Sequence, residues 1–159
     1  MVRNSVVIAP CTEQDIPEVN TLKVKPFQKV YCDLPSKILS ENKEGVSAHV
    51  IKKDGNILGM FCVNTGFYLG FTFARFDTPG ISSFMIDQDS QGKGFGTEAC
   101  RMMPVYLRTV APRARGSYML VTTQNAGAYK AFTRGGWVDT GDKYTLGHTG
   151  PQHILWLAH

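Results

Sequence analysis

The chain has no apolar run that approaches the roughly 18 residues of a membrane-spanning helix. Its start, MVRNSVVIAPCTEQD, has too short an apolar stretch for a signal peptide. It has only four cysteines, which lie far apart and fit neither the CxxC spacing of metal sites nor a small disulfide scaffold. We therefore expect a soluble, cytoplasmic protein with reduced thiols, no contact with membranes and no metal site.

Net charge is also small, because 17 Lys+Arg residues stand against 13 Asp+Glu residues, which gives +4. That balance alone does not favour binding to nucleic acid. A length of 159 residues with 43% hydrophobic residues suits one domain with its own core, and we expect a single domain over residues 1–159. The positive charge is concentrated in residues 91–137, where Glu98 is the only acid against seven basic residues. This segment is either an Arg-rich helix surface or a surface that attracts a polyanion.

Hydrophobic periodicity and turn residues predict seven strands and four helices in the order of an α/β protein with a mixed sheet. Aromatic residues alternate along residues 67–76, and we expect that segment to be a strand or extended. The expected strands are residues 6–9, 46–53, 57–64, 80–87, 118–122, 137–140 and 154–158, and the expected helices are residues 12–22, 36–42, 95–110 and 125–134.

The strongest local signal is a buried strand, ending Phe84-Met85-Ile86-Asp87, that leads into the glycine-rich turn Gln91-Gly92-Lys93-Gly94-Phe95-Gly96-Thr97. Glycines let backbone N–H groups approach phosphate oxygens, and the following helix N-terminus adds partial positive charge. Neither the P-loop nor the dinucleotide-binding pattern fits this turn. The turn is either an anion site or only a tight connection between strand and helix.

A second signal follows about 30 residues later. Asn125, Ala128, Phe132 and Gly135-Gly136-Trp137 occupy a fixed spacing. Together with Gln91-x-x-Gly94-x-Gly96, this pattern resembles the GNAT superfamily of N-acetyltransferases. The hallmarks of that family are a [QR]xxGx[GA] turn and the segment N-x-x-A-x-x-x-Y-x-x-x-G-[FW]. The sequence around the turn, FMID…QGKGFGTEA, is most similar to bacterial diamine and spermidine acetyltransferases. A looser match to the same group occurs at Leu22, Val24, Gln28, Tyr31, Ser36 and Glu41.

The resemblance implies a GNAT-like mixed, mostly antiparallel central sheet flanked by helices, with acetyl-CoA as co-substrate. It implies that the strand end holds the pantetheine and the thioester, the turn holds the pyrophosphate, and Asn125 contacts the CoA arm. The negative charge of CoA would also account for the basic excess in residues 91–137, with Lys93, Arg101 or Lys130 as candidates for the outer phosphates. The implied cofactor-binding residues are Phe84, Met85, Ile86, Gln91, Gly92, Lys93, Gly94, Phe95, Gly96, Thr97, Asn125 and Phe132.

The resemblance does not identify the catalytic acid, because Phe132 stands where the family usually has a proton-donating tyrosine. Tyr129, about one helical turn earlier, is our candidate acid. Asp87 is the candidate base, with capping of the glycine turn as its alternative role. Other candidates for the acid are Tyr31, Tyr106, Tyr144 and an ordered water.

Acidic residues in the N-terminal part are candidates for binding a cationic acceptor, and we select Glu41 and Asp33, with Glu18 as a further candidate. The resulting hypothesis is transfer of an acetyl group from acetyl-CoA to a primary amine of a small molecule, such as a polyamine. Alternative acceptors are an aminoglycoside or a peptide N-terminus, and an alternative function is a non-catalytic acyl-CoA-binding module. Nucleic acid is not expected as a partner, and a homodimer is compatible with the resemblance.

Overall fold

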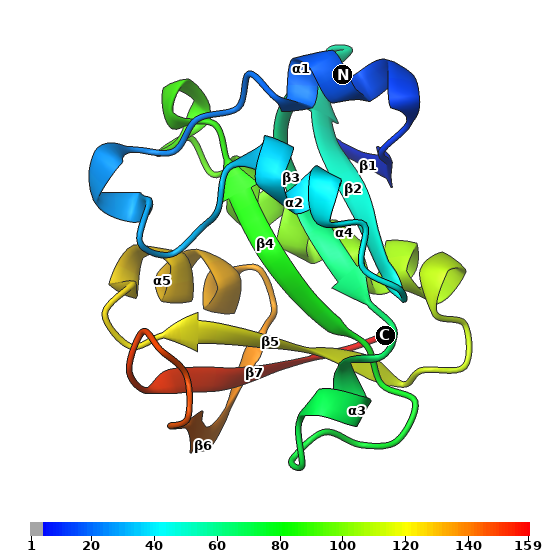
Figure 1. Cartoon of the computed structure of the whole chain (residues 1–159), viewed down its shortest axis with the longest axis vertical. Helices are drawn as coiled ribbons and strands as arrows, with labels where there is room; N and C mark the ends of the chain where they lie inside the picture. Colours follow the sequence, from blue (N-terminus) through cyan, green and yellow to red (C-terminus); the bar gives the residue numbers. More distant parts are fainter. Residues whose placement is uncertain (1–4) are drawn as a thin grey trace.

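The computed structural model describes residues 5–159 and forms one seven-stranded sheet with helices on both faces (Figure 1). The strand order is β1-β2-β3-β4-β5-β7-β6, and each neighbouring pair is antiparallel except β4 and β5. The predicted mixed, mostly antiparallel α/β sheet is therefore confirmed. The strands are β1 Val7–Pro10, β2 Val46–Lys53, β3 Asn56–Asn64, β4 Gly80–Ile86, β5 Gly116–Thr122, β6 Val138–Tyr144 and β7 Gln152–Ala158. The helices are α1 Ile16–Val19, α2 Pro35–Glu41, α3 Phe67–Gly70, α4 Phe95–Val110 and α5 Ala126–Arg134, with 3-10 turns at Glu13–Asp15, Pro26–Gln28 and Gln88–Ser90.

The expectation of extended structure in residues 67–76 is wrong. The segment begins with the short helix α3 and continues in turns. Where this segment leads into β4, both edges of that strand are paired, because Gly80 pairs with Asn64 of β3 and with Tyr118 of β5, so the segment meets no free strand edge there. The alternating aromatics instead gather into a cluster, in which Phe67 stacks on Phe71 and on Tyr118 of β5. The first helix is also shorter than expected and ends at Val19.

Two main groups of buried side chains lie on opposite faces of the sheet. Helices α4 and α5 pack on one face through residues such as Met103 and Phe132, and α1 and α2 cover the other (Figure 1). The two helices on the first face also touch each other closely. The Thr97 hydroxyl donates to the Ala131 carbonyl at 3.1 Å, and a side chain at Gly135 would collide with Cys100. Residue 135 must therefore stay glycine for α5 to lie against the start of α4.

Strands β4 and β5 are paired only where they begin. The pairs are Gly80 with Tyr118 and Ile81 with Met119, after which the strands diverge (Figure 1). On its other edge β4 carries a bulge, because its pairing with β3 is irregular between Met60 and Cys62. At that bulge Ser83 has a φ of 53°, a left-handed conformation that is costly for a residue other than glycine. Because β4 and β5 diverge, the edge of β4 that faces β5 is open beyond Ile81, and a wedge lies between the two strands.

Within residues 5–159, no helix has the length and apolar character needed to cross a membrane. All four cysteines are free, with Cys62 and Cys100 buried and Cys11 and Cys32 partly exposed. The same described residues contain no group of three or more His, Cys, Asp and Glu that could hold a metal ion.

A histidine is buried in the core between β2 and α4. His49 is only 3% exposed and stacks on Phe61, with ring centroids 5.2 Å apart. Its Nε2 lies 2.8 Å from the Ser47 hydroxyl, and its Nδ1 hydrogen-bonds the Tyr106 hydroxyl. Burial lowers the pKa of His49 to about 4 and raises the pKa of Tyr106 to about 12, so both groups are neutral at pH 7.

This buried histidine predicts a loss of stability in mild acid. Between pH 6.5 and about 4 the unfolded chain binds a proton at His49 that the folded chain does not, so the free energy of unfolding falls as the pH falls. We expect His49 to account for roughly 1–3 kcal/mol of this fall. Urea unfolding of wild type and His49→Gln at pH 7, 5.5 and 4.5 measures it. Parallel pH dependences in the two proteins would refute the assignment.

Candidate active site

A cleft of about 800 Å³ opens in the wedge between β4 and β5. Its walls come from β4, from the glycine-rich turn and the first residues of α4, from α5, and from the N-terminal segment of residues 24–32. Eleven of the twelve predicted cofactor-binding residues line it: Phe84, Met85, Ile86, Gln91, Gly92, Gly94, Phe95, Gly96, Thr97, Asn125 and Phe132. The exception is Lys93, whose ammonium instead donates to the Asp89 carbonyl at 3.2 Å.

The glycine-rich turn has the backbone geometry of an anion site. Gly92 and Gly94 have φ values of 75° and 83°, which glycine adopts without strain. Helix α4 begins directly after Gly94, and the Gly94 carbonyl accepts from the amide of Glu98 at 3.0 Å. The N–H groups of the preceding helical residues, 95 to 97, have no carbonyl one turn earlier within the helix, so they are free to bind an anion at the cleft.

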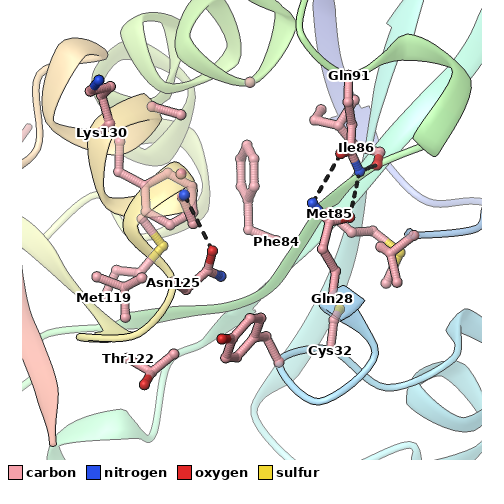
Figure 2. A pocket seen from close by; sticks show the side chains of 18 of the residues that line it. Gln28, Cys32, Phe84, Met85, Ile86, Gln91, Met119, Thr122, Asn125 and Lys130 are labelled. Carbon is pink, nitrogen blue, oxygen red and sulfur yellow. Dashed lines mark hydrogen bonds between the residues drawn. The ribbon is translucent and has the colours of Figure 1, made fainter. Parts of the chain in front are cut away.

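Two glutamines join this turn to the N-terminal segment. The Gln91 amide nitrogen donates to the Ile86 carbonyl and to the Gln28 side-chain oxygen, each at 2.9 Å, and the Gln28 amide nitrogen donates back to Gln91 at 3.0 Å (Figure 2). The end of β4, the turn and the 3-10 turn Pro26–Gln28 are thereby held together. The looser match at residues 22–41 already contained Gln28, but nothing in the sequence indicated its partner.

Helix α5 supplies the opposite wall and positive charge. The Phe132 ring meets the Phe84 ring edge-on, with centroids 5.1 Å apart, and Phe84 lies in the middle of the cleft (Figure 2). Asn125 caps the helix by accepting from the Ala128 amide at 3.4 Å. Lys130 and Arg134 also line the cleft. Backbone donors and two cations around one cleft fit a ligand that carries phosphates.

Comparison with known protein families identifies the family of this chain. The model of the acetyltransferase (GNAT) family matches residues 16–137. The chain belongs to the GNAT acetyltransferase family. GNAT enzymes transfer an acetyl group and use acetyl-CoA as co-substrate, so the predicted family, enzyme class and co-substrate are confirmed.

Solved structures share the fold at low sequence identity. The aminoglycoside acetyltransferase AAC(6')-Ib, in complex with ribostamycin and coenzyme A, is 17% identical with a TM-score of 0.78, over 98% of this chain and 94% of that one. A spermidine N-acetyltransferase chimera from Vibrio cholerae and hSSAT is 13% identical with a TM-score of 0.68, over 97% and 95%. A putative phosphinothricin N-acetyltransferase is 21% identical with a TM-score of 0.58, over 97% and 98%. No curated protein matches the chain.

The two predicted catalytic residues of this GNAT enzyme are not brought to the cleft. The Tyr129 hydroxyl donates to Asp139 at 2.9 Å, and its ring packs on His153. The hydrogen bond to Asp139 raises the pKa of Tyr129. Asp87 accepts backbone N–H groups of Lys23 at 2.9 Å and of Asp89 at 3.2 Å. The structure therefore gives Asp87 the capping role that was its alternative and places Tyr129 in a contact between α5 and β6.

The predicted acceptor-binding carboxylates also lie outside the lining. Glu41 pairs with Lys43 at 2.9 Å, and Asp33 pairs with Lys37 at 3.4 Å. Glu18 accepts from the backbone N–H of Ile57 at 2.8 Å. The lining from the N-terminal segment is instead Val24, Phe27, Gln28, Tyr31 and Cys32, and uncharged side chains of Thr122, Thr149 and Gln152 complete it.

The positions of the tyrosines leave one candidate for the proton donor. Tyr106 is bound to His49 in the core, and Tyr144 packs against Phe71. Among the described tyrosines, Tyr31 is the one that lines the cleft. From the sequence, Tyr31 was only an alternative candidate for the acid, because its segment has no regular periodicity that would indicate which side chains face inward.

Substitution of Gly94 by valine should disrupt binding at the turn. A β-branched residue cannot adopt a φ of 83° without strain, so the turn would open and lose its aligned N–H groups. We expect the affinity for acetyl-CoA, measured by calorimetry, to fall more than about tenfold, or about 1.4 kcal/mol. Gly141→Val is the matched control, since Gly141 has a φ of 87°, an added side chain there would meet no neighbouring atom, and the residue does not line the cleft. Equal affinities in the two folded variants would contradict this assignment.

Proposed function

We propose that this GNAT enzyme transfers the acetyl group of acetyl-CoA to a primary amine of a small molecule by direct attack in a ternary complex. The observation that supports this most is that one continuous cleft joins the phosphate-binding turn to the open edge of β4 and to the N-terminal segment. Both substrates can therefore reach the same point. Four free cysteines agree with the cytoplasm as the proposed compartment.

The residues present fit acetyl-CoA. The turn and α5 offer backbone N–H groups, Lys130 and Arg134 to its phosphates, and the wedge between β4 and β5 accepts its extended arm. When bound, acetyl-CoA supplies a thioester carbonyl as the electrophile. Backbone N–H groups on the unpaired edge of β4, beyond Ile81, can donate to that carbonyl oxygen as negative charge develops on it.

The reaction forms a C–N bond, breaks the C–S bond, removes one proton from the amine and adds one to the departing thiolate. Among residues 5–159, those that line the cleft include no Asp, Glu or His. The amine must therefore lose its proton to water, without a side-chain base in direct contact. For the thiolate, we propose that the Tyr31 hydroxyl is the proton donor, because Tyr31 is the one described tyrosine that lines the cleft and the Phe132 side chain has no proton to donate.

An assay of thiol release tests the function. Acetyl-CoA is incubated with a panel of small primary amines, the free thiol is followed over time, and mass spectrometry checks for a gain of one acetyl group on the amine. Since only the neutral amine attacks, kcat/KM should rise with pH toward the pKa of the amine. Acetyl-CoA binding without thiol release from any amine would refute the proposed function.

Tyr31→Phe tests the proton donor. The variant keeps the ring and removes the hydroxyl, so we expect kcat to fall about tenfold or more while the dissociation constant of acetyl-CoA stays unchanged. Tyr144→Phe is the matched control, because Tyr144 packs outside the cleft and should keep wild-type kcat. Full activity of Tyr31→Phe would assign proton donation to water.

A further inference from the structure

Within the described part of the chain, the cleft presents no negative side chain with which to bind a polycation. Thirty-three residues line it, and none of them is Asp or Glu. The charged side chains of the lining are both positive, Lys130 and Arg134. The hypothesis of a polyamine acceptor drew on the resemblance to diamine and spermidine acetyltransferases and on three acids, Glu18, Asp33 and Glu41, none of which lines the cleft.

The segment of residues 20–32 brings no acidic side chain to the cleft. Between Asn20 and Cys32 the sequence NTLKVKPFQKVYC has three lysines, Lys23, Lys25 and Lys29, and no acid. Figure 1 shows this segment beside α5, and both line the same cleft. These three lysines do not line the cleft, and Lys130 and Arg134 are the proposed partners of the acetyl-CoA phosphates, so the lining offers an amine with several positive charges no carboxylate with which to pair.

The same wall is apolar where it faces the cleft. Val24, Phe27 and Tyr31 line it, and Phe27 leaves 69% of its surface exposed, which a bound molecule could cover. Cys32 lies beside them, and burial raises the pKa of its thiol to about 11, so it stays uncharged at neutral pH. Across the cleft, Leu120 and Thr122 add no charge.

We infer that the acceptor is a small monoamine with an uncharged, aromatic or apolar body, and that polyamines and aminoglycosides are poor acceptors. This inference rests on the proposed acetyl transfer and names its substrate class. The body of the acceptor would lie against Phe27, Val24 and Tyr31, and its single amine would point toward the open edge of β4. Binding would then depend on contact area and not on ion pairing.

Steady-state thiol release with four amines tests the class. 2-Phenylethylamine has the stated chemistry, spermidine and kanamycin are polycations, and phenylalanine adds a carboxylate to the same body. We expect kcat/KM for 2-phenylethylamine to exceed that of each other amine about tenfold or more, with a KM that hardly changes between about 50 and 300 mM salt. A higher kcat/KM for spermidine, kanamycin or phenylalanine would overturn the inference and leave the acetyltransferase function intact. Bound acetyl-CoA without release from any amine would overturn both.

A pair of exposed residues provides the matched variants. Phe27 and Val30 are each 69% exposed, but only Phe27 lines the cleft. Phe27→Ala should raise the KM for 2-phenylethylamine about fivefold or more and leave the KM for acetyl-CoA unchanged, whereas Val30→Ala should change neither. Equal KM values for 2-phenylethylamine in Phe27→Ala and wild type would overturn the placement of the acceptor on this wall.

Discussion

The pairing of β4 with β5 through only two residue pairs is the constraint on which the rest of the site depends. A parallel pair that continued to Ile86 would close the sheet and leave no space for a ligand arm. Because the strands diverge after Ile81, polar backbone groups of β4 face a cleft, where they would otherwise be satisfied by a neighbouring strand. The bulge and the left-handed Ser83 occur on the same stretch of β4. Irregular backbone is thus concentrated at the open edge of β4, where we propose that the thioester binds.

A wedge of this kind needs walls that do not collapse into it. On one side the contact of Thr97 with Ala131, together with the glycine at residue 135, holds α5 against the start of α4. On the other side the paired amides of Gln28 and Gln91 hold the N-terminal segment at the end of β4. The glycine-rich turn belongs to both contacts, since it carries Gln91 and leads into the helix that carries Thr97. We expect the shape of the wall at residues 24–32 to be coupled to that of the glycine-rich turn.

The parts of the fold that local chemistry specifies were predictable from sequence. The hairpin of β2 and β3, the strand before the glycine turn and the capped helix α5 were all expected within a few residues of their observed bounds. The failures concern long-range partners. Tyr129 is three residues from Phe132, yet Asp139 and His153, on strands β6 and β7, supply its contacts away from the cleft. The wall at residues 24–32 has almost no regular structure, so its inward-facing side chains could be found only from the folded chain.

The charge of the sequence agrees with the cleft where it predicts a phosphate ligand, whereas the acids selected to bind the acceptor do not line the cleft. The basic excess of residues 91–137 fits a phosphate ligand because Lys130 and Arg134 reach the cleft. The acids of residues 1–90 do not place negative charge at the cleft, because several of them bind groups elsewhere in the fold. Glu18 accepts a backbone N–H of β3, and Asp87 accepts two backbone N–H groups near the turn. A carboxylate bound to backbone amides has its charge stabilised by fixed dipoles of the protein, and one on the surface outside the cleft is screened by solvent. The segment of residues 24–32 therefore presents uncharged side chains to the cleft, although residues 1–90 carry ten acids against nine bases.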